Sequence, residues 1–177
     1  CRAQQIPVLR RCSGGGTVLQ GPGCLNYALI LKIRDSGPLA TITGTNSFVM
    51  NAHRQALTAA LGQKVEIQGH TDLSIDHRKF SGNSQRRKRN FLLFHGTFLL
   101  HLDLSLVEEL LRLPSRQPDY RRNRAHREFL RNLNVSPALV EAVLCKAWSV
   151  RHALAERTHP EARAARPLWP RARHRRL

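Results

Sequence analysis

The stretch RRCSGGGTVLQGPG, Arg10 to Gly23, places three consecutive glycines directly after two arginines, a cysteine and a serine, and before a β-branched pair. Glycine loses more backbone freedom on folding than any other residue, so such a run marks either a flexible linker or a site of close approach. A linker would continue in Ser, Gly and Pro, whereas Thr17-Val18-Leu19 follows here and predicts a strand-like segment. Two interpretations stay open for the glycines: an anion-binding loop of backbone N–H and guanidinium groups, or an ordinary tight turn.

The composition predicts one globular domain with an acidic partner. The 177 residues are 41% hydrophobic and carry 29 Lys and Arg against 12 Asp and Glu, a net charge of +17 that is concentrated after residue 112. Such a field attracts nucleic acid or an acidic protein. Aromatic residues make up only 6%, which argues against a base-stacking surface and so against nucleic acid as the partner. No apolar run reaches the roughly 18 residues of a membrane span, so no membrane partner is expected.

The cysteines predict neither a metal site nor secretion. Four are present, with no C-x-x-C spacing and no metal-ligand pattern: Cys1, Cys12, Cys24 and Cys145. The first residues hold no apolar core of the signal-peptide type, and thiols without a secretion signal indicate a cytoplasmic protein. Cys24 is either a nucleophile or a small buried apolar residue.

The order of predicted elements indicates an α+β domain. We expect a central strand over 25–33 and a helix over 45–61 that ends at Gly62 and whose apolar face holds Phe48 and four alanines (52, 56, 59 and 60). Short strands follow at 65–67, 72–76 and 79–85, with a turn at 76–77, a solvated loop at 86–90, and strands 91–94 and 98–100 separated by residues 95–97. Three helices complete the domain: one opened by a capping box at 105–108 and closed by Pro114, one over 121–133, and one over 137–155 capped by Ser136.

Two further segments carry candidate chemistry. In Arg78-Lys79-Phe80-Ser81-Gly82, strand alternation would place Lys79 and Ser81 on the same side. A lysine aimed into a pocket supplies a point charge for phosphates and carbonyl oxygens, although a surface lysine on an edge strand is the alternative. In His95-Gly96-Thr97, a histidine and a glycine break an apolar strand, either within a site or at a strand bulge.

Taken in order, the motifs R-R-x-S-G-G-G-[TA]-V, D-L-x-[IV], R-K-x-S-G and H-G-T-x-L-L resemble the catalytic domain of the lipoate–protein ligase family, within the biotin and lipoate protein ligase superfamily. The resemblance covers roughly residues 6–133. It implies a mixed, mainly antiparallel β-sheet flanked by helices, as in class II aminoacyl-tRNA synthetases and biotin synthetase. We expect this domain over residues 1–155, followed by a basic, flexible tail over 156–177. The matching residues are Arg10, Arg11, Ser13, Gly14, Gly15, Gly16, Thr17, Val18, Gly69, Asp72, Leu73, Arg78, Lys79, Ser81, Gly82, His95, Gly96, Thr97, Leu99 and Leu100.

The resemblance also implies an activity. Such ligases join lipoate (or octanoate) and ATP, accompanied by Mg²⁺, into an acyl-adenylate and then acylate one lysine of an acidic lipoyl acceptor domain. Lys79 would be the catalytic residue, at the acyl carbonyl and the α-phosphate. Gly82 would let the ligand pass close to its strand, and His95 and Gly96 would complete the pocket wall without a proton-transfer role. The implied substrate- and adenylate-binding residues are Arg11, Gly14, Gly15, Gly16, Thr17, Val18, Leu19, Asp72, Ser81, Gly82, His95 and Gly96.

The chain departs from the family pattern in two places. Only about nine residues precede the arginine pair, where the family has a strand–helix–strand segment, so we expect that N-terminal segment to be missing. Gly69-His70-Thr71-Asp72-Leu73 stands where relatives have Gly-x-Asn-Asp-Leu.

Two alternative functions stay open. An octanoyltransferase would act through a cysteine thioester, yet no cysteine lies between Cys24 and Lys79; the other is a non-catalytic nucleic-acid-binding relative.

The arginine-rich regions predict where an acidic acceptor would dock. Arginines of the 112–131 region, including Arg121, Arg122, Arg124 and Arg127, form one candidate docking rim. The basic loop expected at 86–89 could extend this rim, because a hairpin loop just beyond the Lys79 strand can overhang the pocket. The alternative is that these arginines are only solvated.

Overall fold

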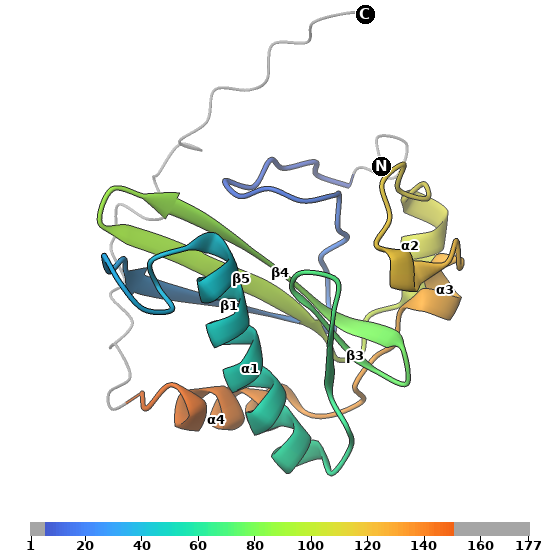
Figure 1. Ribbon diagram of the computed structural model, residues 1–177. Coiled ribbons are helices and arrows are strands. Elements are labelled where there is room, and N and C mark those ends of the chain that lie inside the picture. Colours follow the sequence, from blue (N-terminus) through green and yellow to red (C-terminus); the bar gives the residue numbers. More distant parts are fainter. Residues whose placement is uncertain (1–5, 151–177) are drawn as a thin grey trace, which may run out of the picture.

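The computed structural model describes residues 6–150 and has an α+β architecture, as expected (Figure 1). Its sheet has five strands in the order β1-β5-β4-β3-β2, and every neighbouring pair is antiparallel. In chain order the elements are β1 Cys24–Lys32, α1 Ile42–Leu61, β2 Glu66–Gln68, β3 Asp72–Ile75, β4 Arg78–Lys88, β5 Phe91–Leu99, α2 Leu104–Leu110, a 3₁₀ turn Asp119–Arg121, α3 His126–Phe129 and α4 Pro137–Ala147. Within the described range, no helix combines the length and apolar character needed to cross a bilayer.

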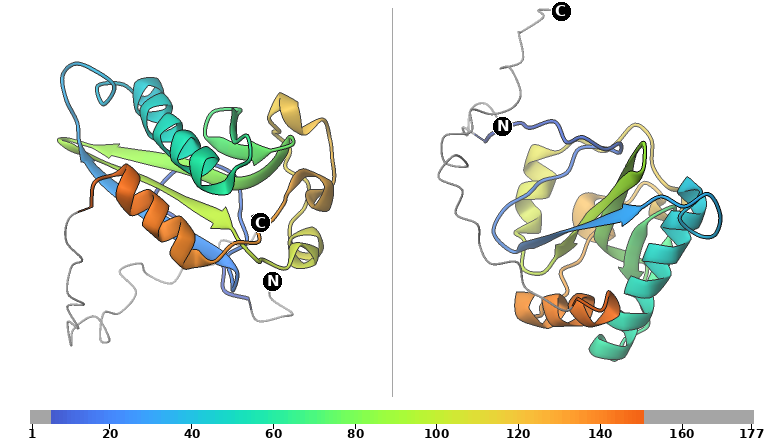
Figure 2. Two further views of the ribbon diagram at one scale, coloured as in Figure 1. Left: turned by 90° about the horizontal axis from the view of Figure 1, so that it is seen from below. Right: turned by 90° about the vertical axis from the view of Figure 1, so that its left-hand side faces the viewer.

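The two faces of the sheet have different coverings (Figure 2). On one, the core face, Phe80, Phe94 and Phe98 are fully buried among residues of α1 and α4. Each such burial stabilises the fold by about 1.5–3 kcal/mol. Across the other face runs the irregular segment of residues 6–23, so we call this the loop face. A side chain on β4 or β5 therefore reaches either the core or this segment, depending on alternation.

The strand over 25–33 is not central as predicted: β1 lies at one edge of the described sheet. Its burial alternates, because only the side chains on the core face pack against the apolar cluster, whereas Ile30 on the other face is 67% exposed. A continuous apolar run therefore did not distinguish an edge strand from a central one.

Helix α1 ends at Leu61 as predicted, with Gly62 left-handed at φ 62° and its N–H bonded to the Thr58 carbonyl. The predicted apolar face is wrong. The buried residues are Thr45, Val49, Met50, His53 and Leu57, whereas Phe48 is 42% exposed and the alanines lie at the side or outside. Alanine favours a helix through its backbone propensity but has little surface to bury, so it did not mark the core side.

The turn at 76–77 is confirmed, with Asp76 and His77 at positive φ (51° and 57°). The predicted loop at 86–90 is wrong, because β4 continues to Lys88 and only residues 89–90 turn. Arg86 and Arg87 pair with Leu93 and Leu92 of β5, and their side chains donate to backbone carbonyls on opposite faces of the sheet. The predicted break at 95–97 is also wrong: β5 pairs continuously with both neighbours from Phe91 to Phe98.

After β5 the chain is less helical than predicted. Asp103, not Ser105, caps α2 through its side chain, and Leu111 follows the helix as an extended residue. The helix predicted over 121–133 is reduced to α3, because Arg122 and Asn123 take left-handed conformations. Ser136 caps α4 as expected by accepting from the Leu139 N–H. The predicted continuation of this helix over 148–150 is wrong, because α4 ends at Ala147. Residues 151–155 of that predicted helix, and the tail over 156–177, lie outside the described residues.

Candidate active site

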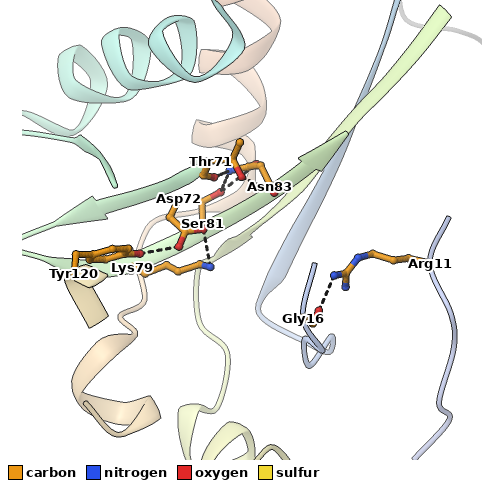
Figure 3. Close-up of polar contacts among 8 residues, drawn as sticks. All are labelled: Arg11, Gly16, Thr71, Asp72, Lys79, Ser81, Asn83 and Tyr120. Atoms are coloured by element: carbon orange, nitrogen blue, oxygen red, sulfur yellow. Dashed lines mark hydrogen bonds and ion pairs between the residues drawn. The ribbon is translucent and has the colours of Figure 1, made fainter. Parts of the chain in front are cut away.

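An ion pair stands at the centre of the site, on the hairpin formed by β3 and β4 (Figure 3). Lys79 Nζ lies 2.7 Å from Asp72 Oδ1, and the two side chains are only 25% and 16% exposed. The backbone of Lys79 is fixed as well, because the Arg131 N–H donates to the Lys79 carbonyl at 2.9 Å. The lysine is thus held at both its backbone and its amine.

A β-bulge decides which way Lys79 points. Ser74 pairs with Lys79 and Leu73 pairs with Ser81, so Phe80 is an extra residue on β4 and the alternation slips by one position. Lys79 therefore lies over Gly82, where an added Cβ would come 2.9 Å from Nζ. Ser81 instead contacts Asn83 on the core face and is 1% exposed. The prediction that Lys79 and Ser81 share a side is wrong, because alternation does not reveal a bulge.

Tyr120 is a residue of the site that the sequence reasoning missed. Its hydroxyl donates to Asp72 Oδ2 at 2.7 Å, from the 3₁₀ turn after α2 (Figure 3). Burial raises the pKa of the Tyr120 phenol above its ordinary value, and the Asp72 charge raises this pKa further, so the phenol stays a hydrogen-bond donor. Tyr120 lies 48 positions from Asp72 in a stretch without periodicity, so no sequence signal joined them.

The glycine segment is a loop rather than a turn leading into a strand. Arg11 Nε donates to the Gly14 carbonyl (3.0 Å) and Arg11 Nη2 to the Gly16 carbonyl (2.6 Å), so the guanidinium organises its own loop. Ser84 of β4 also donates to the Gly14 carbonyl, at 3.1 Å. Residues 17–19 form no strand, and Thr17 and Val18 are exposed, so that strand prediction is wrong. Glycine is required by conformation at Gly15, whose φ is 104°.

These hydrogen bonds are accepted by backbone carbonyls of the glycine loop and do not involve its backbone N–H groups. Among the described residues, no backbone N–H of positions 12–18 donates to another group of the protein. Consecutive open N–H groups beside a guanidinium suit an anion. The arrangement therefore fits the anion-binding interpretation of the three glycines better than that of a closed turn.

His95 and Gly96 lie on opposite faces of β5. His95 Nε2 is 2.6 Å from Ser13 Oγ on the loop face, and burial, aided by the Arg11 charge, lowers the pKa of His95. A Cβ at Gly96 would overlap Asn83 Oδ1 on the core face. This oxygen also accepts a hydrogen bond from the Tyr27 hydroxyl, at 2.6 Å. Gly96 thus makes room for a buried polar contact on the core face, and its place in a pocket wall stays a prediction.

The predicted site residues accordingly fall into three groups. Seven lie on the loop face of the sheet or in the loop that crosses this face: Arg11, Gly15, Gly16, Asp72, Lys79, Gly82 and His95. Gly14 joins them through its carbonyl. Thr17, Val18 and Leu19 continue the loop, while Ser81 and Gly96 face the core. Within residues 6–150, no group of three or more His, Cys, Asp and Glu side chains could hold a metal ion.

Comparison with known proteins identifies the family. The sequence profile described as the lipoyl protein ligase A/B catalytic domain matches residues 1–143. The chain belongs to this family. Lipoate-protein ligase 1 of Staphylococcus aureus is 35% identical over 117 residues, which are 63% of this chain and 32% of that protein. Lipoate-protein ligase LplJ of Bacillus subtilis is 32% identical over 108 residues, covering 61% and 31%.

Solved ligase structures share the architecture of this family member. A bipartite lipoate protein ligase from Thermoplasma acidophilum, described with its E2 lipoyl domain, has a TM-score of 0.70 at 25% identity, covering 84% of this chain and 58% of that chain. Lipoate-protein ligase A bound with ATP has the same TM-score at 23% identity, covering 84% and 60%. The chain spans about a third of the length of the two curated relatives.

Proposed function

We propose that this family member is a lipoate–protein ligase, which activates lipoate or octanoate with MgATP and acylates a lysine of a lipoyl acceptor domain. One observation carries the proposal: the Lys79 ammonium group is held at 2.7 Å from Asp72 on the sheet face that the open glycine loop crosses. A fixed cation and unpaired backbone donors on one face are what a nucleotide phosphate and an acyl carboxylate require.

The proposed reaction has two steps. A carboxylate oxygen of the acid attacks the α-phosphorus of ATP, the bond to pyrophosphate breaks, and a mixed anhydride forms. The amine of the acceptor then attacks the acyl carbonyl, AMP leaves and an amide results. Negative charge develops on phosphate and carbonyl oxygens in these steps, where Lys79 and the loop N–H groups would stabilise it. The magnesium ion enters with ATP as part of the substrate.

Gly82 takes a different role from the expected one. Its missing side chain leaves the space that the Lys79 amine fills, because a Cβ there would stand 2.9 Å from Nζ and 3.0 Å from Cε. We assign Gly82 to placing the lysine rather than to admitting the ligand.

A cysteine-thioester octanoyltransferase has weak support. Cys24 opens β1 and pairs with Leu99, and burial raises the pKa of its thiol. A cysteine nucleophile needs a lowered pKa and a positively charged neighbour. The free thiols of Cys12, Cys24 and Cys145 fit a reducing compartment such as the cytoplasm, and Cys1 lies outside the described residues.

The docking surface for an acidic acceptor must be redrawn from the structure. Arg86 donates to the Cys12 carbonyl and Arg87 to the carbonyls of Leu39 and Ala40, so reversing their charge would disturb the glycine loop and the start of α1. Arg121 is buried. Arg122 and Arg127 of the predicted rim have exposed side chains. Arg112 and Arg116 are exposed as well, between α2 and the Tyr120 turn.

Charge reversal at these two positions tests the docking surface. The double variant Arg112→Glu, Arg116→Glu should slow acyl transfer to the acceptor and flatten its salt dependence, while adenylate formation is unchanged. The matched control is Lys64→Glu, Lys146→Glu, at exposed lysines away from this region. Equal slowing in both double variants would refute docking at this rim.

Mass spectrometry of a lipoyl acceptor domain tests the proposed function itself. Incubation of the full chain with the domain, MgATP and either lipoate or octanoate should add one acyl group to one lysine, and omission of ATP should abolish the addition. Transfer from an octanoyl thioester without ATP would instead identify an octanoyltransferase. Salt-sensitive binding of nucleic acid with no acylation under any condition would favour the non-catalytic alternative.

A further inference from the structure

The segment of residues 119–131 encloses the lysine hairpin. Arg124 Nη2 donates to the His77 carbonyl at 2.9 Å, at the turn between β3 and β4. Arg78 Nη2 donates to the carbonyls of Arg127 and Leu130, at 3.0 and 2.8 Å. Together with the bond from Arg131 to the Lys79 carbonyl, these contacts fasten the segment on both sides of Lys79. The arginines of this segment thus include structural ones, not only solvated ones.

Tyr120 is held firmly within this segment. Its ring lies 5.2 Å from the ring of Phe129, centre to centre, and the buried Arg121 guanidinium stacks over the same Phe129 ring at 4.6 Å. On the other side, a Cβ on Gly69 would contact the Tyr120 ring at 3.7 Å. The hydroxyl is therefore aimed at Asp72 by packing around its own ring.

We propose that Tyr120 is a positioning residue, which fixes the Asp72 carboxylate so that the Lys79 amine is held in one place over Gly82. The hydroxyl occupies Oδ2 at 2.7 Å and leaves Oδ1 for the lysine, also at 2.7 Å. Without that bond, the carboxylate can rotate about its last torsion, and Lys79 loses a fixed partner. The catalytic meaning of this placement rests on the proposed function, whereas the placement itself does not.

The arrangement also protects the site from its own product. An ammonium group has no lone pair, so it stabilises charge but cannot attack a carbonyl. A neutral Lys79 amine beside an acyl-adenylate would attack the acyl carbonyl, form an amide, release AMP and lose a proton. Asp72 Oδ1 engages the Lys79 amine in an ion pair, so Tyr120, by fixing Asp72, reserves the acyl group for the lysine of the acceptor.

Competitive amine labelling of the full chain tests the placement without any substrate. A trace of acetic anhydride labels every accessible neutral amine, and peptide mass spectrometry gives the ratio of Lys79 to the exposed Lys64. Tyr120→Phe should raise this ratio by about three- to tenfold, as expected for the loss of one hydrogen bond. The control Tyr27→Phe removes a hydroxyl that donates to Asn83 on the core face, and it should leave the ratio unchanged.

Further results separate this inference from the proposed function. An unchanged Lys79 ratio in Tyr120→Phe, or an equal rise in Tyr27→Phe, would overturn the positioning role. Asp72→Asn should reproduce the rise, because it removes the charged partner directly. With lipoate and MgATP, Tyr120→Phe should also accumulate acyl-Lys79 and lose kcat of pyrophosphate release more than it raises KM. Raised labelling in a chain that never releases pyrophosphate would uphold the positioning and refute the ligase.

Discussion

The variant Gly82→Ala tests the placement of the Lys79 side chain independently of the stability of the fold. The new Cβ would stand 2.9 Å from Lys79 Nζ and 3.0 Å from its Cε. To reach an ordinary contact of roughly 3.5 Å, the amine must move by about 0.6 Å, away from its place beside Asp72. The end of a lysine side chain moves easily, and Gly82 has no positive φ, so the backbone accepts alanine. Alanine in a strand is even favoured over glycine by about 0.5–1 kcal/mol.

We therefore expect the free energy of unfolding of Gly82→Ala to stay within about 1 kcal/mol of the parent. The rate of lipoate-dependent pyrophosphate release should fall about 10- to 100-fold, because misplacing a charged group by a fraction of an ångström is costly in catalysis. Urea unfolding and a coupled pyrophosphate assay measure the two quantities. Gly21→Ala, whose Cβ would meet only Leu102 at 3.9 Å, is the control. Full activity in Gly82→Ala would refute the reasoning.

Two further predictions concern the loop and the core. Gly15→Val should abolish binding of ATP and lipoate in calorimetry, because φ is 104° and a Cβ would meet Arg11 Nη2 at 2.7 Å; binding equal to the parent would contradict the anion loop. His53 is fully buried, which lowers its pKa to about 4 from 6.5. Only the unfolded chain binds this proton between those values, so the free energy of unfolding should fall by about 3 kcal/mol from pH 6.5 to 4. His53→Phe should show a correspondingly smaller fall, and an unchanged one would contradict the assignment.

The ordered motifs predicted the fold class and most of the candidate site. Lys79 and the glycine loop were singled out by residue type, because a lysine and glycines are unusual within such segments, whereas Asp72 was named through the family resemblance. The turn at Asp76-His77 and the Ser136 cap were predictable for the same reason. Structural features that depend on a few neighbouring residues can be predicted without knowledge of the tertiary structure.

Contacts between distant residues could not be predicted. The bulge at Phe80 reverses the expected side of Ser81, and no local pattern distinguishes it from regular alternation. Tyr120 joins the site from a 3₁₀ turn whose course depends on Arg124 and Arg131 reaching hairpin carbonyls. Arg86 was read as a solvated side chain because its acceptor, the Cys12 carbonyl, lies 74 positions away.

Pyrophosphate release with Lys79→Ala tests the central claim most directly. The full chain with MgATP and lipoate should release pyrophosphate, and Lys79→Ala should release it about 10²–10³-fold more slowly. Lys64→Ala, which removes a lysine that is 85% exposed, should match the parent. Circular dichroism and thermal unfolding should show that Lys79→Ala is folded. Release at the parental rate by folded Lys79→Ala would contradict the claim that this lysine carries the chemistry.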